Sequence, residues 1–316
     1  MIKKILILLI IIGIIFYGYT SIYQPLSEES DLKIFNIEKG SSIKEIAQEL
    51  ENEGLIKSSS FLITYCLLTN NRNIQAGEYL LSPQMNIPQI TEIIVGGKVN
   101  EEKITIIEGW DLNDIAQYLE EKGISTKEEF FSVAGKPKSE NSLEGYIFPD
   151  TYNITSRDTA ETIVQKALLN FEKKINAELR EEIERQGKTI DEIIIMASII
   201  EKEVRTLEDK KNVSDVLWRR IESGMPLQSC ATVLYALEEK KSSVSTADTQ
   251  VDSPYNTYKY KGLPIGPISN PGMDSIVAAI YPTKNNYWYY LSSPDGKTHF
   301  SVTLEEHNYK KNLYLR

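Results

Sequence analysis

The chain has 316 residues, of which 41% are hydrophobic, and a formal net charge of -10 at pH 7. This length and composition predict a folded protein of one to three domains, and the acidic balance argues against nucleic-acid binding, which usually requires a basic face. The two cysteines, Cys66 and Cys230, lie far apart and match no metal-ligand or redox spacing. We therefore interpret both as packing residues and expect neither a disulfide nor a metal site.

The N-terminus carries the first predicted element, an apolar helix. Lys3 and Lys4 precede an uncharged run that lasts until Glu28, and a helix needs about 20 apolar residues to cross a bilayer. We predict a cytoplasmic tail over residues 1–4 and a single-pass transmembrane anchor over residues 5–25, with the rest extracytoplasmic by the positive-inside rule. The predicted localisation is the cell membrane. A cleaved signal peptide is the alternative, but the small-x-small cleavage pattern that it requires is poor here.

An internal repeat follows the apolar run, in which Gly40 matches Gly109 and Gly54 matches Gly123. The two copies, 69 positions apart, read "IFNIEKGSSIKEIAQELENEGLIKSSSF" and "KITIIEGWDLNDIAQYLEEKGISTKEEF". Each copy predicts a short strand, a glycine turn, an amphipathic helix and a glycine stop. Such a unit can bind a ligand or partner, or act as a structural spacer, and the pattern does not decide between these roles.

Changes in composition suggest the domain boundaries. The stretch "AGEYLLSPQMNIPQITEIIVGGKV" predicts a strand, a turn and a helix after the first copy, so residues 32–100 form one subdomain. Residues 101–140 hold the second copy of the repeat and lead into the main domain. The polar loop "AGKPKSENS" then introduces a main domain over residues 141–316.

A buried helix that ends in two carboxylates is the most informative stretch. Thr189 and Glu192 form a capping-box pattern at its start, and "IIIMASII" is apolar on every side, which predicts burial on every side. Glu201 and Glu203 follow, about 200° apart around the helix axis. We expect Glu201 to continue the buried surface and Glu203 to fall at the frayed end.

Partial burial and an unfavourable helix dipole would raise the pKa of a carboxyl at this position. A raised pKa is what a general acid needs at neutral pH, so Glu201 is the candidate acid. The alternative is a solvated helix end in which Lys202 offsets the charge. The stretch alone leaves both interpretations open.

The residues that follow favour a functional site. A second helix, capped by Thr206 with Asp209, would bend the chain close to Glu201. The apolar run "LQSCATVLYAL" then carries four polar groups. Four prolines between Pro254 and Pro271 make a long irregular segment, of a kind that is usually functional. The tyrosines of this region offer flat faces that suit sugar rings, although ordinary packing also explains them.

Five motifs, taken together, resemble the YceG-like (MltG) family of endolytic murein transglycosylases. They read "EGYIFPDTY", "ASIIEKEV", "LWRRIESGMPLQS", "SPYNTYKYKGLPIGPISNPG" and "HFSVTLEEHN", in the family's order. The resemblance implies a membrane anchor, a LysM-like α/β subdomain over residues 32–100 and an α+β catalytic domain. The predicted fold class is therefore α+β, with an N-terminal transmembrane helix.

The resemblance also implies a peptidoglycan lyase whose catalytic glutamate corresponds to Glu201. In the implied mechanism one carboxylic acid protonates the glycosidic oxygen between N-acetylmuramic acid and N-acetylglucosamine. It then takes the proton of the muramoyl C6 hydroxyl, which attacks C1 and leaves a 1,6-anhydro end. The implied partners are glycan strands and penicillin-binding protein synthases, the implied role is to terminate strand elongation, and no cofactor is expected.

The family resemblance further implies residues that line the glycan groove and bind acetamido groups. One departure from the family is Cys230, which stands where many relatives have aspartate, and we interpret it as a small apolar filler. The predicted substrate-binding residues are Gln228, Ser229, Thr232, Tyr235, Tyr255, Asn256 and Tyr258.

Two other functions remain as alternatives. A hydrolase of the same substrate would need a second carboxylate, for which Asp150 and Glu203 are the candidates. A non-catalytic glycan-binding scaffold would recruit synthases without cleaving anything. His299 and His307, the only histidines, make a poor zinc site and lack a nucleophile-elbow sequence, so we expect both to be structural.

Overall fold

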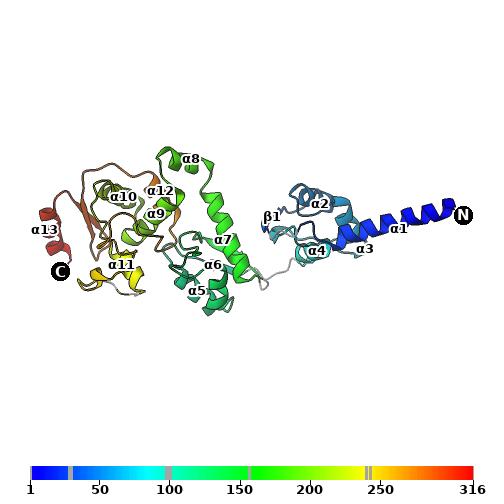
Figure 1. Ribbon diagram of the computed structural model, residues 1–316, viewed down its shortest axis with the longest axis horizontal. Helices are drawn as coiled ribbons and strands as arrows, with labels where there is room; N and C mark the ends of the chain where they lie inside the picture. The colour runs from blue at the N-terminus through cyan, green and yellow to red at the C-terminus, as the bar shows by residue number, and fades with distance from the viewer. Residues whose placement is uncertain are drawn as a thin grey trace. The chain divides into compact units, whose positions relative to one another are not determined.

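A computed structural model describes residues 2–27, 31–96, 102–155, 158–238, 241 and 244–315. The chain divides into two compact units, over residues 1–101 and 102–316 (Figure 1). The three small sheets are two-stranded and antiparallel, and helices form most of both units. The α+β class is therefore confirmed.

Unit 1 is built around one antiparallel strand pair. Strand β1 pairs with β2 in a register that sets Lys33 opposite Leu81, and the alternating residues Phe35 and Ile37 point into the core with Leu50. Its elements are α1 (Ile2–Tyr23), β1 (Lys33–Ile37), α2 (Ile43–Asn52), α3 (Ser59–Leu68), β2 (Gly77–Leu81) and α4 (Ile87–Val95).

The membrane prediction is wrong. Among the residues that the structure describes, no helix has both the length and the apolar character needed to cross a bilayer. The predicted span ran to residue 25, whereas α1 ends at Tyr23 and its last turns pack on α3 and α4. The ring of Tyr17 lies 5.7 Å from that of Phe61, and Ser21 is buried. The single-pass anchor over residues 5–25 and the cell-membrane localisation are both corrected by this finding.

The predicted repeat is confirmed in its local structure. Strand β3 (Glu102–Thr105) and helix α5 (Leu112–Glu121) begin 69 positions after β1 and α2. The turn glycines Gly40 and Gly109 both have positive φ, at 97° and 80°, a conformation that glycine adopts without strain. The second copy belongs to unit 2, where its buried residues pack with those of α7.

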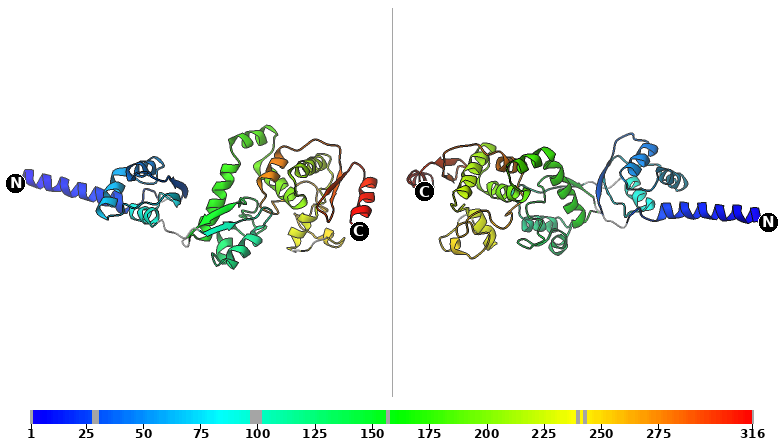
Figure 2. Two further views of the ribbon diagram at one scale, coloured as in Figure 1. Left: turned by 180° about the vertical axis from the view of Figure 1, so that it is seen from behind. Right: turned by 45° about the horizontal axis from the view of Figure 1, so that its top comes forward.

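Unit 2 holds the remaining elements. Strand β3 pairs with β4, and β5 pairs with β6 as a hairpin that lies beside α13 (Figure 2). The elements after α5 are α6 (Lys127–Ala134), β4 (Thr151–Ile154), α7 (Ala160–Lys174), α8 (Ala177–Arg185), α9 (Ile190–Glu203), α10 (Leu207–Glu222), α11 (Cys230–Leu237), η1 (Asp248–Gln250), α12 (Met273–Ile280), β5 (Tyr289–Ser292), β6 (Thr298–Ser301) and α13 (Leu304–Tyr314).

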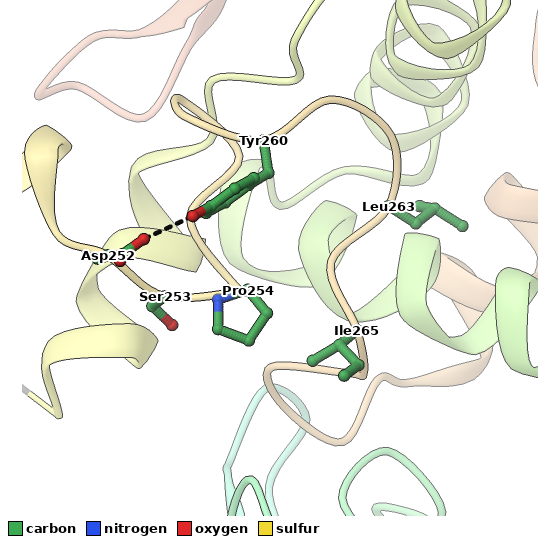
Figure 3. Close-up of a pocket in the computed structure, with 6 residues that line it drawn as sticks. All are labelled: Asp252, Ser253, Pro254, Tyr260, Leu263 and Ile265. Atoms are coloured by element: carbon green, nitrogen blue, oxygen red, sulfur yellow. Dashed lines mark hydrogen bonds between the residues drawn. The ribbon is translucent and has the colours of Figure 1, made fainter.

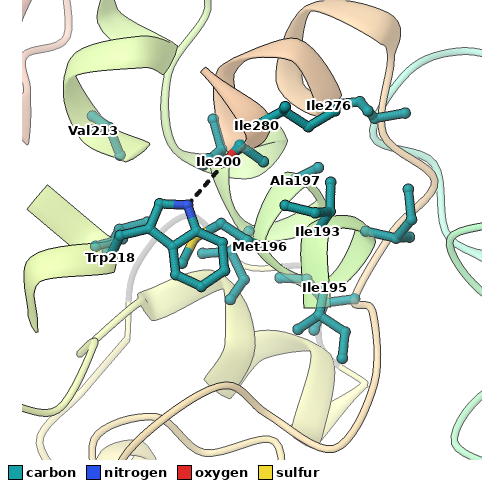
Figure 4. Packing of buried hydrophobic residues seen from close by; sticks show 14 of the residues in the cluster. Ile193, Ile195, Met196, Ala197, Ile200, Val213, Trp218, Ile276 and Ile280 are labelled. Carbon is teal, nitrogen blue, oxygen red and sulfur yellow. Dashed lines mark hydrogen bonds between the residues drawn. The ribbon is translucent and has the colours of Figure 1, made fainter. Parts of the chain in front are cut away.

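Helix α9 is the central helix of unit 2. Its start carries the predicted capping box of Thr189 and Glu192, and every residue from Ile193 to Ile200 is buried. It packs on α10 and α12, and the indole nitrogen of Trp218 donates a hydrogen bond to the carbonyl of Ala279 at 3.0 Å (Figure 4). This packing fixes the position of the helix end that carries both glutamates.

Candidate active site at the end of helix α9

Glu201 points toward α10 and α12. Its Oε1 lies 3.0 Å from the Nζ of Lys210, in an ion pair whose side chains are only 9% and 3% exposed. Its Oε2 accepts hydrogen bonds from the amide of Gly272 at 3.0 Å and from the hydroxyl of Ser275 at 2.7 Å. Because Gly272 and Ser275 lie at the start of α12, the negative charge also matches that helix dipole. Glu201 therefore connects α9 with α10 and α12.

The surroundings of Glu201 are closely packed. A Cβ on Gly272 would lie 2.0 Å from the Oε1 of Glu108, and one on Gly109 would lie 3.4 Å from the Cγ of Glu201. Burial and the nearby charge of Glu201 raise the pKa of Glu108. Glu108 and Glu201 do not line the cavity beside Glu203 that is described next.

Glu203 points the other way and lines a cavity of about 710 Å³. Its Oε1 accepts a hydrogen bond from the hydroxyl of Ser229. The hydroxyl of Ser292 donates to the backbone carbonyl of Glu203 at 3.2 Å. Burial raises the pKa of Glu203, and the hydroxyls of Ser229 and Tyr290 offset part of this rise. The expectation that Glu203 lies at a frayed end is wrong, because Ser229 and Ser292 hold its carboxyl and its backbone carbonyl.

The cavity is formed between α9, α11 and the second copy of the repeat. Its volume falls in the range of ligand-binding pockets, and both apolar and polar groups face it. The side chains that line it include those of Glu203, Cys230 and Tyr235.

Glu144 joins three segments behind the cavity wall. Its Oε2 accepts hydrogen bonds from the amide of Leu112 at 3.2 Å and the hydroxyl of Tyr235 at 3.1 Å, and its Oε1 accepts one from the side-chain amide of Asn270 at 3.1 Å. Burial, together with the nearby charge of Asp111, raises the pKa of Glu144 to about 8. This carboxyl fixes the positions of α5 and α11 on either side of the cavity.

Three of the predicted substrate-binding residues lie at or next to the cavity. Tyr235 lines it, and Ser229 bonds to Glu203. Tyr258 lies one step away, with its hydroxyl 3.2 Å from the thiol of Cys230. The exposed Cys230 thiol itself lines the cavity, so its interpretation as an apolar filler is wrong.

The other four predicted residues do not line the cavity. Gln228 is exposed, with a positive φ of 54°. Thr232 and Asn256 are buried and bond within the protein: the Thr232 hydroxyl to the carbonyl of Ser229 at 2.8 Å, and the Asn256 amide to the carbonyl of Val251 at 2.8 Å. Tyr255 packs on Tyr235, with ring centroids 5.0 Å apart. These residues shape the loop that supports the site.

A second, more open hollow lies within the proline-rich segment itself. It has a volume of about 460 Å³ and is lined by Pro254, Tyr260, Leu263 and Ile265, among others (Figure 3). The hydroxyl of Tyr260 donates to the carboxylate of Asp252, which also pairs with Lys259 at 2.8 Å. These bonds lower the pKa of Asp252, so this hollow offers no acid comparable with Glu203.

The histidines have local contacts. The Nε2 of His299 lies 3.1 Å from the hydroxyl of Ser293, and its ring stacks on Tyr314. His307 stacks on Tyr289. These contacts agree with the predicted structural roles.

Sequence reasoning did not find Tyr290 and Arg220. Tyr290 comes from a strand near the C-terminus, and its alternation with Ser292 indicates only that the two share a face. Arg220 lies in a helix that reads as amphipathic, where an arginine is usually exposed. In the structure only 6% of its surface is exposed.

Comparisons with known proteins give consistent results. The YceG-like family profile matches residues 35–312. An endolytic murein transglycosylase of Bacillus subtilis (strain 168) is 32% identical over 330 residues, covering 97% of this chain and 91% of that protein. One of Streptococcus pneumoniae serotype 2 is 30% identical over 336 residues, covering 93% of this chain and 61% of that protein. The crystal structure of a YceG-like protein from Listeria monocytogenes is 36% identical, with a TM-score of 0.62. The match covers 90% of this chain and 100% of the Listeria chain.

Proposed function

The chain belongs to the YceG-like family, and on this premise we propose that it is a peptidoglycan lytic transglycosylase. It cleaves the bond between N-acetylmuramic acid and N-acetylglucosamine within glycan strands and leaves a 1,6-anhydro-muramoyl end. The relatives' activity as endolytic murein transglycosylases supports this reaction. The cavity beside α9, with the Glu203 carboxyl in its wall, supports it independently.

The observation that carries the mechanism is the environment of Glu203. It faces the cavity, its carboxyl accepts a hydrogen bond from the neutral hydroxyl of Ser229, and burial raises its pKa, so it can hold a proton for donation. Glu201, the residue predicted from the sequence, has its carboxylate occupied by Lys210 and by donors from α12. We therefore favour Glu203 as the acid, and Glu201 stays the competing assignment.

One carboxyl group then carries out both proton transfers of the reaction. The Glu203 acid protonates the glycosidic oxygen as the bond to C1 breaks, and the resulting carboxylate accepts the proton of the muramoyl C6 hydroxyl. That oxygen attacks C1 and closes the anhydro ring. Because no water attacks, a second carboxylate is unnecessary, unlike in most glycoside hydrolases.

The cellular role follows from the product. An anhydro end cannot be extended at C1, so cleavage of a growing strand ends its elongation, and a penicillin-binding protein synthase is the natural partner. Within this proposal unit 1 acts as the LysM-like module that binds glycan.

The test is product analysis by mass spectrometry. Purified glycan strands are digested with the full-length protein and with the matched variants Glu203→Gln and Glu201→Gln. We expect anhydro-muramoyl ends from the wild type and from the folded fraction of Glu201→Gln, and none from Glu203→Gln. Loss of cleavage only in Glu201→Gln would transfer the acid role to that residue.

The same digestion separates the two alternatives. Reducing muramic ends would identify a hydrolase and require a second essential carboxylate. A wild type that binds strands but never cleaves them would support the scaffold.

A further inference from the structure

The turn that carries Ser229 is held by Thr257, a residue of the proline-rich segment. The backbone amide of Ser229 donates to the hydroxyl of Thr257 at 3.1 Å, and the amide of Gln228 donates to the carbonyl of Thr257 at 3.1 Å. Just upstream, the Nη1 of Arg220 donates to the carbonyl of Leu227 at 2.6 Å. Leu227, Gln228 and Ser229 are therefore each bonded to a residue of another element.

These bonds hold a backbone conformation that is uncommon in proteins. Gln228 has a φ of 54°, which residues other than glycine rarely adopt. Such a conformation persists only where the surrounding structure holds it. The bonds from Arg220 and Thr257 do so on either side of Gln228, and they set the direction in which Ser229 leaves the turn.

The direction of each hydroxyl bond follows from the number of protons. A hydroxyl carries one proton and two lone pairs. Thr232 donates its proton to the carbonyl of Ser229 at 2.8 Å, so in its 2.8 Å contact with Thr257 the hydroxyl of Thr257 is the donor. Thr257 also accepts from the Ser229 amide, which closes a ring of bonds among three buried residues. The hydroxyl of Ser229 lies outside this ring and donates to Glu203.

From this ring we propose that Thr257 is a positioning residue for the acid, acting through Ser229. Its hydroxyl holds the Ser229 backbone so that the Ser229 hydroxyl reaches the carboxyl of Glu203, which faces the cavity. This inference rests on the proposed function and on Glu203 as the acid. It assigns Thr257 no contact with the substrate.

The ring has a consequence for proton transfer. A hydroxyl that donates to a carboxylate stabilises the charged form and lowers the pKa of the acid, so loss of the Ser229 bond raises the pKa of Glu203. Replacing Thr257 or Ser229 by an apolar residue changes no charge nearby. The other charged and titratable groups around Glu203, including those that share its cavity wall, are Arg220 from α10, Cys230 from α11, Tyr258 from the proline-rich segment, Tyr290 from β5, Asp111 and Lys202.

The experiment compares Thr257→Val, Thr257→Ser and Ser229→Ala in the full-length protein, with Thr91→Val as the control. Valine keeps the shape of threonine without its hydroxyl, whereas serine keeps the hydroxyl. Thr91 is also fully buried, but its hydroxyl donates to the carbonyl of Ile87 within α4. The pH titration of Glu203 is followed by carbon-13 NMR of labelled glutamate carboxyls, with the resonance assigned by its loss in Glu203→Gln. The pH profile of kcat/KM on glycan strands is measured in parallel.

We expect Thr257→Val to move the Glu203 titration and the basic limb of kcat/KM to higher pH together, and to lower kcat on the order of tenfold. Ser229→Ala should act in the same direction. Because Thr257 acts through Ser229, the double variant should titrate like Ser229→Ala alone. Thr257→Ser should restore the wild-type values, and Thr91→Val should change neither.

A second variant keeps the test decisive if Thr257→Val does not fold. Thr232→Val opens the ring on its other side and should move the Glu203 titration in the same direction. Titration curves of the folded variants that coincide with the wild type would overturn the inference, and so would glycan cleavage by Glu203→Gln. If the wild type yields no anhydro ends, the proposed function fails, while the NMR titration still decides whether Thr257 controls Glu203.

Discussion

The two sides of the α9 C-terminus differ in what they do with the same functional group. On one side Glu201 meets a lysine and two donors from α12, in a packed interior. On the other side Glu203 contacts the neutral hydroxyl of Ser229 and a cavity. The charge of Glu201 stabilises contacts between helices, whereas Glu203 can exchange a proton with a ligand in the cavity. Burial alone therefore does not show which carboxyl can act as a general acid. The ion-pair and hydrogen-bond partners of each carboxyl do.

The largest expected effect comes from the cavity side. Glu203→Gln keeps the shape of the side chain but cannot donate or accept the transferred proton, so turnover should fall by about 10³-fold or more. Glycan cleavage is the measurement, with thermal unfolding as the control for folding. Because the charge of Glu203 is not part of a buried ion pair, stability should change little. A Glu203→Gln variant that cleaves at the wild-type rate would show that Glu203 is not the acid.

The packed side should respond in stability. Glu201→Gln leaves the buried Lys210 without its counter-charge, and breaking a buried pair typically costs about 3–5 kcal/mol of unfolding free energy. Urea denaturation measures this loss. The double variant Glu201→Gln with Lys210→Met should recover much of it, because both charges are then absent. Unchanged stability in the single variant would mean that the pair does not join these helices.

A third carboxyl sharpens the comparison through pH. Glu144 has a folded-state pKa of about 8 because it is buried, above the value of about 4.3 expected when unfolded. The folded state therefore retains a proton that the unfolded state loses. The stability gained is complete below pH about 4.3 and is lost as pH rises through about 8, by an amount on the order of 5 kcal/mol.

Glu144→Gln should flatten this dependence, because glutamine mimics the neutral acid at every pH. Chemical denaturation at a series of pH values between 5 and 9 checks it. Parallel curves for the variant and the wild type would show that Glu144 is charged in both states.

The smallest effect should come from the packing around Glu201. Gly272→Ala places a methyl group against the carboxylate of Glu108, which must shift, at a cost of about 1 kcal/mol. Adding Glu108→Ala supplies the missing space and should restore stability in the same denaturation measurement. If the double variant is no more stable than the single one, the clash is not with Glu108.

The sequence predicted the elements well because their boundaries are set locally. Thr189 with Glu192, and Thr206 with Asp209, cap α9 and α10 as expected. The turn glycines predicted the repeat, since only a few residues tolerate positive φ. These features depend on neighbours within four residues.

The site could be predicted only in outline. Helical geometry separated Glu201 from Glu203, but which one faces a cavity depends on Lys210, Gly272 and Ser229, which lie in or next to three other helices. Likewise, polar residues such as Asn256 look the same in sequence whether they bind a ligand or fold a loop. The apolar N-terminus was misjudged because counting hydrophobic residues ignores the packing of its last turns on α3.

The exposed thiol in the cavity wall also makes the protein convenient to study. The chain has two cysteines; Cys66 is buried in unit 1 and Cys230 is exposed. A maleimide fluorophore should therefore react at one place in the unaltered sequence, within a few bonds of Glu203's partner Ser229. Its emission would report occupancy of the cavity in real time, and a disulfide tether at the same atom would allow fragments of glycan to be captured there.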